Sequence, residues 1–387
     1  MRRRPILSVD IAQQRARRKV PRSVYAFIEG GTQGEYTVRA NRVAFDEVTF
    51  RPRAGIFTSE RSLSTSVLGC DLSMPVVLAP AGLVRLAHRG AEVLAAKVAG
   101  DLGLATGVST LASSPIEAVT AATTGPVWYQ VYFAGGKRGA EIAIDRAREA
   151  GCRALLVTLD SAVQSRREKL AAGRGVPSRV SLRTALQWAP ETLVRPKWLW
   201  DYMQDGFRLE VPNVRSAPDG PPLSAAEASA SMRQAAPTWA DLEWIRERFG
   251  GPIAAKGILS AEDARRAVDH GASAVIVSNH GGNALDGTPA TLRVLPEIVE
   301  AVGDVTEVLM DGGIRRPGDI AKALALGARA VLIGRAYIWA LAGGGEQGLR
   351  ELLGELHEGL DGVLALLGCE SVHDLDPSYV SLPRSWS

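Results

Sequence analysis

The segment "VSNHGGNALDGTPA", residues 277 to 290, places one histidine, one aspartate, two asparagines and three glycines directly after an apolar run. Imidazole titrates near neutral pH, so His280 is a candidate for taking a proton from a substrate. A nearby carboxylate would orient the ring and favour its charged form. Asp160 ends another apolar run and is the candidate for that role. We therefore expect His280 to be a base and Asp160 its supporting carboxylate.

A lysine interrupts the apolar run "IAAKGI", residues 253 to 258. A buried ammonium group needs a negative partner or loses its charge, so a plain surface role for Lys256 is disfavoured. Lys256 could stabilise an anion on a cofactor, or it could form a Schiff base as in barrel aldolases. Both uses remain open from the residues alone.

Glycines and arginines gather in "DGGIRR" and "IGRAY" near the end of the chain. Backbone N–H groups and a guanidinium group are the usual ligands of phosphate in such places. The sequence therefore predicts a phosphorylated cofactor or substrate held by Gly312, Gly313, Arg315, Gly334 and Arg335. Metal binding is not expected, because HxH and HExxH patterns and clustered carboxylates are absent from the sequence.

These residues follow short apolar runs that recur along the chain and alternate with amphipathic segments. The runs occupy residues 75–82, 104–110, 127–132, 154–160, 253–258, 274–280, 307–313 and 330–335. Nearly continuous apolar runs are typical of strands buried on both faces of a parallel sheet. Eight strand and helix units predict an α/β fold, a (β/α)₈ TIM barrel, whose active site lies at the C-terminal ends of the strands.

The chain should form a single domain over residues 1–387. Residues 1–73 would supply two N-terminal helices and a hairpin that caps the barrel bottom, and residues 74–160 would supply strands one to four. Residues 161–237 are predicted to be a lid insertion after strand four, with a structural subdomain as the alternative. Residues 238–345 would carry strands five to eight, and residues 346–387 a C-terminal helix and tail.

Composition excludes several classes of protein. Lys and Arg number 45 against 42 Asp and Glu, giving a formal charge of +3, and this scattered charge predicts no nucleic-acid partner. No apolar run reaches the roughly 18 residues of a membrane span, and no signal peptide is visible, so we expect a cytoplasmic protein. The three cysteines, Cys70, Cys152 and Cys369, are too scattered for a disulfide framework and are expected to be buried thiols.

The segments "SNHGGNALDGTPA", "KGILSAEDARRAVDHGA", "DGGIRRPGDIAKALALGARAVLIGRAY" and "WYQVYFAGG" resemble the FMN-dependent α-hydroxy acid oxidases and dehydrogenases. The likeness runs from about Ile11 to Leu375. It implies FMN as the cofactor, with Lys256 facing flavin N1 and the C2 carbonyl. The other flavin contacts that it implies are Pro80, Ala81, Gly82, Ser109, Gln130, Thr158, Ser278, Asp311, Gly312, Gly313, Arg315, Gly334 and Arg335.

The same resemblance implies a catalytic set of Tyr25, Tyr132, Asp160, Arg167 and His280, of which Tyr25, Tyr132 and Arg167 would also contact a small-molecule substrate. His280 would remove a proton while hydride passes to flavin N5, and Lys256 would balance the charge that arrives at N1. The family also suggests a homo-oligomer, a tetramer or larger. Oxygen, a quinone or a redox protein could each accept the electrons.

One position departs from the 2-hydroxy acid enzymes, which carry an arginine three residues after the histidine as a clamp for the substrate carboxylate. Here that position is Asn283, which lacks the charged fork. The pattern "SNHGGNxLDGTPA" resembles the pre-mycofactocin synthase branch, which oxidises a peptide-derived aminopyrrolidinone without a carboxylate. "SAVQSRREKLAAGRG" is more similar to the ordinary oxidases.

The leading prediction is therefore oxidation of an uncharged cyclic substrate, with Asn283 among its contacts. An L-2-hydroxy acid dehydrogenase or oxidase that relies on Arg167 is the alternative. A Schiff-base aldolase that uses Lys256 and a catalytically silent flavin-binding or scaffold protein are two further readings.

Overall fold

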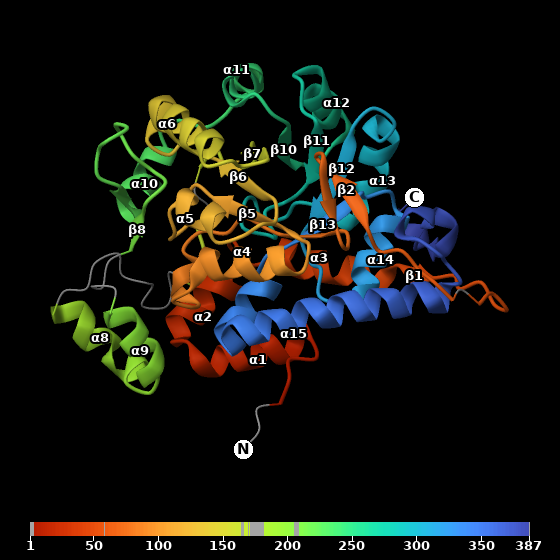
Figure 1. The fold of residues 1–387 in the computed structure, drawn as a ribbon, viewed down its shortest axis with the longest axis horizontal. Helices are drawn as coiled ribbons and strands as arrows, with labels where there is room; N and C mark the ends of the chain where they lie inside the picture. The colour runs from red at the N-terminus through yellow and green to blue at the C-terminus, as the bar shows by residue number, and fades with distance from the viewer. Residues whose placement is uncertain are drawn as a thin grey trace.

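Eight parallel strands pair side by side and close into a barrel in the computed structural model, which describes residues 4–57, 59–163, 166–168, 170, 182–204 and 209–386. Nearly every strand residue is buried, because helices cover the outside and side chains fill the inside. The predicted (β/α)₈ barrel is confirmed (Figure 1). Its strands are β4 (Val76–Leu78), β5 (Ala105–Ser109), β6 (Val127–Val131), β7 (Ala154–Thr158), β10 (Ile253–Ile258), β11 (Ala274–Val277), β12 (Glu307–Asp311) and β13 (Ala330–Ile333).

Amphipathic helices surround the barrel. Two of them begin where the sequence places helix-start residues: the Ser260 hydroxyl accepts a hydrogen bond from the N–H of Asp263, and Pro317 is the first residue of its helix. The surrounding helices are α4 (Ala91–Asp101), α5 (Ile116–Ala121), α6 (Gly136–Glu149), α11 (Trp239–Phe249), α12 (Ala261–Asp269), α13 (Thr291–Val302), α14 (Pro317–Ala325) and α15 (Arg335–Leu367).

A hairpin of β2 (Thr65–Val67) and β3 (Cys70–Leu72) closes the N-terminal end of the barrel. Its Val67 and Leu72 pack against the inward-facing Trp128 and other interior residues. The N–H of Leu68, at the hairpin turn, donates to the Glu307 carboxylate at the start of β12 over 2.8 Å. This hairpin is the bottom cap that the sequence predicts.

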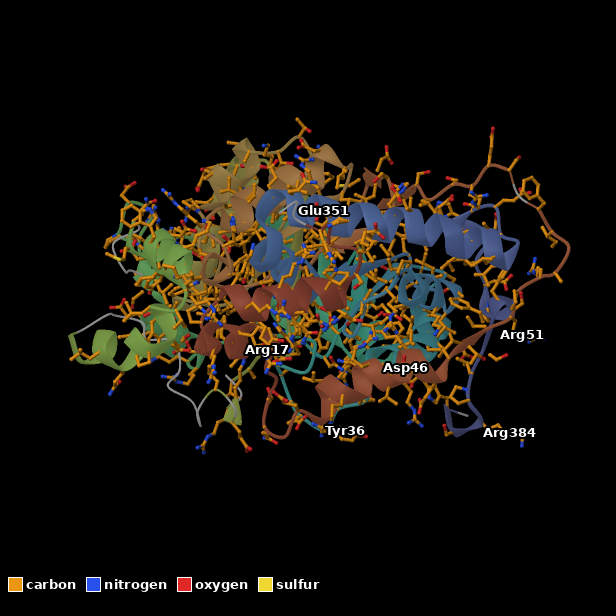
Figure 2. All side chains as sticks on the ribbon, turned by 90° about the horizontal axis from the view of Figure 1, so that it is seen from below. Arg17, Tyr36, Asp46, Arg51, Glu351 and Arg384 are labelled. Atoms are coloured by element: carbon orange, nitrogen blue, oxygen red, sulfur yellow. The ribbon has the colours of Figure 1, made fainter. Side chains whose placement is uncertain are left out.

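The N-terminal segment differs from the prediction, because it forms three helices and not two. They are α1 (Val9–Lys19), α2 (Arg22–Glu29) and α3 (Tyr36–Glu47). α1 lies along α15 in the lower part of the view in Figure 1. Figure 2 shows the two helices from below, with Arg17 of α1 and Glu351 of α15 labelled. The segment between α2 and α3 reaches the opposite end, where Arg335 Nη2 donates to the Gly30 carbonyl over 2.9 Å. The segment after α2 therefore lies at the mouth of the barrel and not at its bottom.

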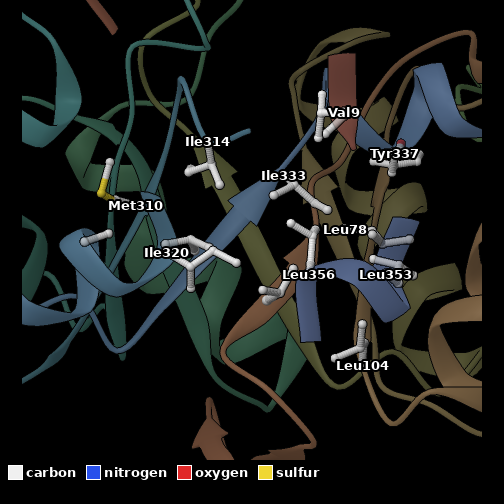
Figure 3. Packing of buried hydrophobic residues seen from close by; sticks show 14 of the residues in the cluster. Val9, Leu78, Leu104, Met310, Ile314, Ile320, Ile333, Tyr337, Leu353 and Leu356 are labelled. Atoms are coloured by element: carbon white, nitrogen blue, oxygen red, sulfur yellow. The ribbon is translucent and has the colours of Figure 1, made fainter. Parts of the chain in front are cut away.

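Packing against α15 holds the last strands to the first ones. Leu353 and Leu356 of α15 are buried with Leu78 of β4 and Ile333 of β13 in one cluster, part of which is drawn in Figure 3. α15 is broken once, at Gly345, where φ is 62° and ψ is −150°. β1 (Thr49–Phe50) pairs with β14 (Val380–Ser381) and ties the chain end to the segment after α3.

The described part of the insertion after β7 contains secondary structure. It comprises α8 (Leu182–Thr192), α9 (Pro196–Met203), β8 (Glu210–Val211), β9 (Leu223–Ser224) and α10 (Ala225–Met232), and α8 and α9 project away from the barrel (Figure 1). Residues 171–181 and 205–208 of the predicted lid lie outside the described residues.

The three cysteines are buried and unbridged, as predicted. Within the ranges that the structure describes, no helix is long and apolar enough to cross a membrane.

Candidate active site

A cavity of about 620 Å³ opens at the C-terminal end of the barrel. This volume lies within the range typical of sites for small molecules and cofactors. Residues at or just after all eight strand ends line it, as expected of this architecture. Nearly all the residues predicted for the site come together here.

His280 lies at the centre of the polar part of this cavity. Its Nδ1 atom is 3.2 Å from both oxygens of Asp160, and its Nε2 atom is 3.0 Å from the Tyr132 hydroxyl. The carboxylate can only accept, so Nδ1 carries the proton of the neutral ring and Nε2 keeps a lone pair. His280 has φ of 59°, a left-handed conformation that is unusual for a residue with a side chain. Such strain is often found at functional sites.

The environment keeps Asp160 ionised and Tyr132 neutral. Burial alone would raise the pKa of Asp160, but the charge of His280, the hydrogen bond from its ring and the charge of Lys256 outweigh burial and bring that pKa to about 2. Burial, and then the charge of Asp160, raise the pKa of Tyr132 far above its usual value. The phenol therefore stays protonated beside the imidazole.

A second polar group joins Lys256, Ser278 and Asp311, which end three neighbouring strands. Lys256 Nζ lies 2.7 Å from the Ser278 hydroxyl and 2.9 Å from the Asp311 carboxylate. The Ser278 hydroxyl also donates to Asp311 over 2.8 Å. Asp311 is the negative partner that a buried lysine requires. The ammonium group is thus held at the cavity wall by a carboxylate and a hydroxyl.

The first strands contribute amide and hydroxyl groups. Gln130 Nε2 donates to Thr158 Oγ1 over 2.8 Å and lies 3.2 Å from the Tyr132 hydroxyl. Ser109 lines the cavity beside the turn of Pro80 and Ala81. This wall is therefore a mixed surface of apolar turn residues and neutral hydrogen-bonding groups.

Two partly buried arginines, Arg315 and Arg335, lie just after the last two strands. Burial, followed by the charges of Arg335 and Arg42, lowers the pKa of Arg315 to about 9. Burial and then the charge of Arg167 lower the pKa of Arg335 to about 10. Neighbouring cations that disfavour one another in this way create a site for an anion.

The loop after β11 is fastened to α3. Asn279 and Asn41 exchange two hydrogen bonds of 2.8 and 2.9 Å between their side-chain amides. The Asp286 carboxylate accepts from the N–H groups of Tyr36 and Thr37 at the start of the helix. The polar residues that surround His280 in the sequence therefore anchor the loop that carries it.

Several predicted residues lie outside the cavity wall. Asp160, Thr158 and Ser278 are in a layer behind it, where they hold His280, Gln130 and Lys256. Tyr25 is not part of the lining, and its hydroxyl bonds to Glu29 over 3.1 Å. Sequence position alone could not separate the two layers.

Arg335 and Arg167 line the cavity but also donate to backbone carbonyls. Arg335 contacts Ile28, Gly30 and Gly281, and Arg167 Nη1 contacts Phe27 over 2.9 Å. Both arginines therefore hold the α2 end of the chain over the barrel mouth.

The sequence missed a group of apolar lining residues. These come from α2, from the turns after β4 and β5, and from the insertion, and they are Phe27, Ile28, Leu83, Leu111, Val211 and Met232. Apolar residues are common in any core, so no local signal separates these from other buried residues. The helix-start pattern "SAAE" at Ser224 does mark α10, which carries Met232.

The described residues fit FMN. Arg315 and Arg335 are two partly buried cations that form no ion pair with a carboxylate of the described residues, and the backbone of Gly312 and Gly313 beside them has positive φ. They could hold the phosphate, Asp311 the ribityl hydroxyls, and Lys256 the electron-rich edge of the ring. Gln130, Ser109 and the Pro80 turn could hold the remainder of the ring. Among the described residues, no group of three or more histidine, cysteine or carboxylate side chains is placed to hold a metal ion.

Known proteins support this assignment of the cofactor. A family model described as FMN-dependent dehydrogenase matches residues 16–382. A pre-mycofactocin synthase from Mycobacterium tuberculosis (strain CDC 1551 / Oshkosh) is 45% identical over 383 residues, which cover 98% of this chain and 95% of that protein. An L-lactate dehydrogenase from Pectobacterium atrosepticum is 37% identical over 365 residues, or 93% of each chain.

A solved structure of a monotopic membrane protein, (S)-mandelate dehydrogenase, is also similar. Its TM-score is 0.90 at 33% identity, with 98% of this chain and 100% of that chain covered. The matches span nearly the whole length of the sequence. The chain therefore belongs to the FMN-dependent dehydrogenase family of α-hydroxy acid oxidases and dehydrogenases, and is an FMN-dependent oxidoreductase.

Proposed function

We propose that the protein oxidises a carbon that carries an amino group in a small, uncharged cyclic substrate, namely a peptide-derived aminopyrrolidinone. The carbon would lose a hydride, the nitrogen would lose a proton, and a C=N bond would form. Water would then hydrolyse the imine to a carbonyl group and ammonia. FMN, when bound, supplies the two-electron acceptor for the hydride.

His280 is the proposed base. Its Nε2 lone pair faces the cavity, and Nδ1–H donates to Asp160, whose negative charge favours the imidazolium that forms when Nε2 takes a proton. The neutral Tyr132 hydroxyl beside Nε2 can donate to that lone pair at rest and can turn to a substrate heteroatom. Proton removal thus needs no other titratable group.

The choice of substrate rests on one atom, Asn283 Oδ1. Asn283 lines the cavity, and its Nδ2 donates to the His280 carbonyl over 3.1 Å, which fixes Oδ1 as the free end of the amide. Oδ1 is buried and accepts no hydrogen bond from any described residue. A buried acceptor needs a donor. An amine or lactam N–H supplies one, whereas a carboxylate has no hydrogen to give and would be repelled.

Sequence likeness supports the same choice. The chain is 45% identical to the pre-mycofactocin synthase and 37% identical to the L-lactate dehydrogenase, each over nearly the whole length. The arginine that clamps a substrate carboxylate in the 2-hydroxy acid enzymes is replaced by Asn283. These observations favour an uncharged substrate.

An L-2-hydroxy acid is the second candidate, because Arg167 also lines the cavity and is mostly buried. Its Cζ atom lies 5.2 Å from the centroid of the Phe27 ring, and its Nη1 donates to the Phe27 carbonyl. A guanidinium so held could contact a carboxylate with its remaining N–H groups. Membership of the FMN-dependent family rules out the Schiff-base aldolase alternative, and Lys256 is held by Asp311 instead.

Anaerobic titration of the FMN-loaded protein separates the two candidates. The flavin absorbance should bleach rapidly with the aminopyrrolidinone and slowly or not at all with L-lactate and (S)-mandelate. Rapid bleaching by lactate alone would reject the proposal. His280→Ala should retain the flavin spectrum but lose bleaching, and unchanged turnover in that variant would favour a catalytically silent flavin protein.

Asn283→Leu tests the role of Oδ1, because it keeps the approximate size of the side chain and removes this acceptor. It also removes the Nδ2 donor to the His280 carbonyl, a loss that should affect both substrate classes alike. We expect kcat/KM for the aminopyrrolidinone to fall by about tenfold or more, the usual cost of one lost hydrogen bond in a buried site. Residual bleaching by hydroxy acids should not fall in parallel. An equal loss for both substrate classes would indicate general damage to the site.

A further inference from the structure

A second cavity, of about 400 Å³, lies behind the flavin cavity. It is bounded by the end of α1, the segment after the 3₁₀ helix η1 (Val84–Leu86), α9 and the break in α15. Ala87 lines both cavities, so the two cavities adjoin each other. None of the residues predicted for the flavin or for catalysis belongs to its lining.

The charge of this second cavity is strongly one-sided. Asp201 is the acidic residue among its described lining, and it already pairs with Lys197 over 2.7 Å. The basic lining residues are Arg18, Lys19, Arg85, Arg89, Arg195 and Lys197. Excess positive charge in a partly enclosed site concentrates anions there.

Two side chains show that the cations are crowded. Burial, and then the charge of Arg89, lower the pKa of Arg85. Burial, and then the charge of Lys197, lower the pKa of His88. An anion between these groups would relieve their mutual repulsion.

The backbone adds donors at the same place. α9 begins at Pro196, and α15 resumes as a helix after Gly345. Lys197 and Gly345, which carry N–H groups at these two places, belong to the lining. The first turn of a helix has N–H groups without intrahelical acceptors and carries a partial positive charge. Two helix starts therefore meet at one basic cavity.

His88 supplies a side-chain donor. Its Nδ1 accepts from the N–H of Gly90 over 3.0 Å, so the proton of the neutral ring is on Nε2. Nε2 faces the helix break, since a Cβ at Gly345 would lie 3.2 Å from it. Charged donors, backbone N–H groups and an imidazole N–H are the groups that bind phosphate.

We infer that this second cavity binds a phosphate-bearing ligand, separately from FMN. The phosphate would lie between Arg85, His88 and Lys197, and the cavity is large enough for an organic group attached to it. α8, α9 and the turn between them expose apolar residues, namely Leu186, Leu193, Val194, Trp200 and Met203. The phosphate could therefore come from a soluble phosphate ester or from the headgroup of an anionic lipid.

Calorimetry on the FMN-loaded protein tests the inference with inorganic pyrophosphate as the probe. The wild-type protein should bind about one equivalent without loss of the flavin spectrum. R18Q/K197Q removes two exposed cations of the cavity and should weaken binding by about tenfold or more.

The matched control is R17Q/R138Q. It removes an exposed arginine of the same helix α1 and the cation of an exposed ion pair within a helix, Arg138 with Glu141, and neither residue lines the cavity. This control should bind pyrophosphate within about twofold of the wild type. Equal weakening in both variants, or no binding to the wild type, would overturn the inference for soluble phosphates.

Vesicle sedimentation distinguishes the source of the phosphate. Vesicles of phosphatidylglycerol should retain the wild type and R17Q/R138Q more than R18Q/K197Q if a lipid headgroup is bound, whereas vesicles of phosphatidylcholine should retain none of them. Pyrophosphate binding without retention on vesicles would assign a soluble ligand. If the cavity variant and the control behave alike in both assays, the cavity is not a phosphate site.

Discussion

At the scale of single residues, the hydrogen bond between His280 and Asp160 makes a prediction about flavin reduction. Asp160 has a pKa of about 2 and stays ionised throughout the working range, so it does not produce the acidic limb of the activity profile. Asp160→Asn removes the carboxylate charge and keeps the shape of the side chain.

Asp160→Asn should slow flavin reduction, by about a hundredfold or more, because the imidazolium formed during proton removal loses its counter-charge. The measurement is the rate of anaerobic bleaching between about pH 5 and pH 9. Ser161→Ala is the control, since Ser161 donates to Asp160 over 3.0 Å and its loss leaves the charge in place. An unchanged rate of bleaching in Asp160→Asn would contradict the proposed role of the Asp160 carboxylate.

At the scale of elements, the turns after β4 and β5 depend on one buried carboxylate. Glu92 of α4 accepts from the N–H of Ser113 over 2.9 Å and from the Ser114 hydroxyl over 2.8 Å. Burial raises the pKa of Glu92 above 4.5, although these hydrogen bonds act in the opposite direction. A raised carboxyl pKa gives stability that is complete below the unfolded pKa and is lost as pH rises through the folded pKa.

Glu92→Gln keeps the shape and most hydrogen bonds of this side chain but cannot ionise. The variant should therefore gain in unfolding free energy relative to the wild type as pH rises from about 4.5 towards neutrality. Glu117→Gln is a control in which the change of unfolding free energy with pH should have the opposite sign. Burial would raise the pKa of Glu117, but its hydrogen bond with Arg146 lowers it. The wild type therefore gains stability as pH rises towards about 4.5, and Glu117→Gln should lose stability relative to it over that lower range of pH. Denaturant unfolding at several pH values gives both differences, and parallel curves for the two variants would contradict the prediction.

The elements also show which parts of the structure could be predicted from the sequence. Strands, helix starts and polar residues at strand ends are local signals, and they predicted the barrel and the place of His280, Lys256 and Asp311. The path of the N-terminal segment depends on contacts between residues more than 200 positions apart, such as Asn41 with Asn279. No periodicity records such a contact. Two helices were therefore expected where three are found, and Tyr25 was assigned to a cavity that it does not line.

The sequence also could not predict whether a side chain at a strand end lies in the cavity wall or behind it. Thr158 and Ser278 have the residue types of cofactor ligands and stand at strand ends, yet they lie behind the cavity wall and hold Gln130 and Lys256. Side-chain direction along a barrel strand alternates, but the local twist decides which layer a residue enters. The free Oδ1 of Asn283 is a similar case, since only the bond from its Nδ2 to His280 identifies it.

At the scale of the whole molecule, the contact between α1 and α15 joins the two ends of the chain. The helices approach closely at Gly343, where an added Cβ would lie 3.0 Å from the Ala12 carbonyl oxygen and 3.0 Å from Arg15 Cβ. Gly354 lies on the same helix with open space around its Cβ position. The two glycines therefore separate the effect of helix propensity from the effect of packing.

Gly354→Ala should stabilise the protein by about 0.5–1 kcal/mol, because alanine loses less backbone entropy in a helix. Gly343→Ala has the same gain in propensity but forces α1 away from α15, and overpacking of this kind costs about 1–3 kcal/mol. The net result should be a lower unfolding free energy than in the wild type, measured by denaturant titration of the FMN-loaded protein. α2 follows α1 after two residues, and Arg335 holds the end of α2 at the barrel mouth, so any strain at Gly343 lies one helix away from the flavin cavity. Equal stabilisation by both substitutions would mean that α1 can shift away from α15 at little cost in free energy. The N-terminal helices would then contribute little to the rigidity of the barrel mouth.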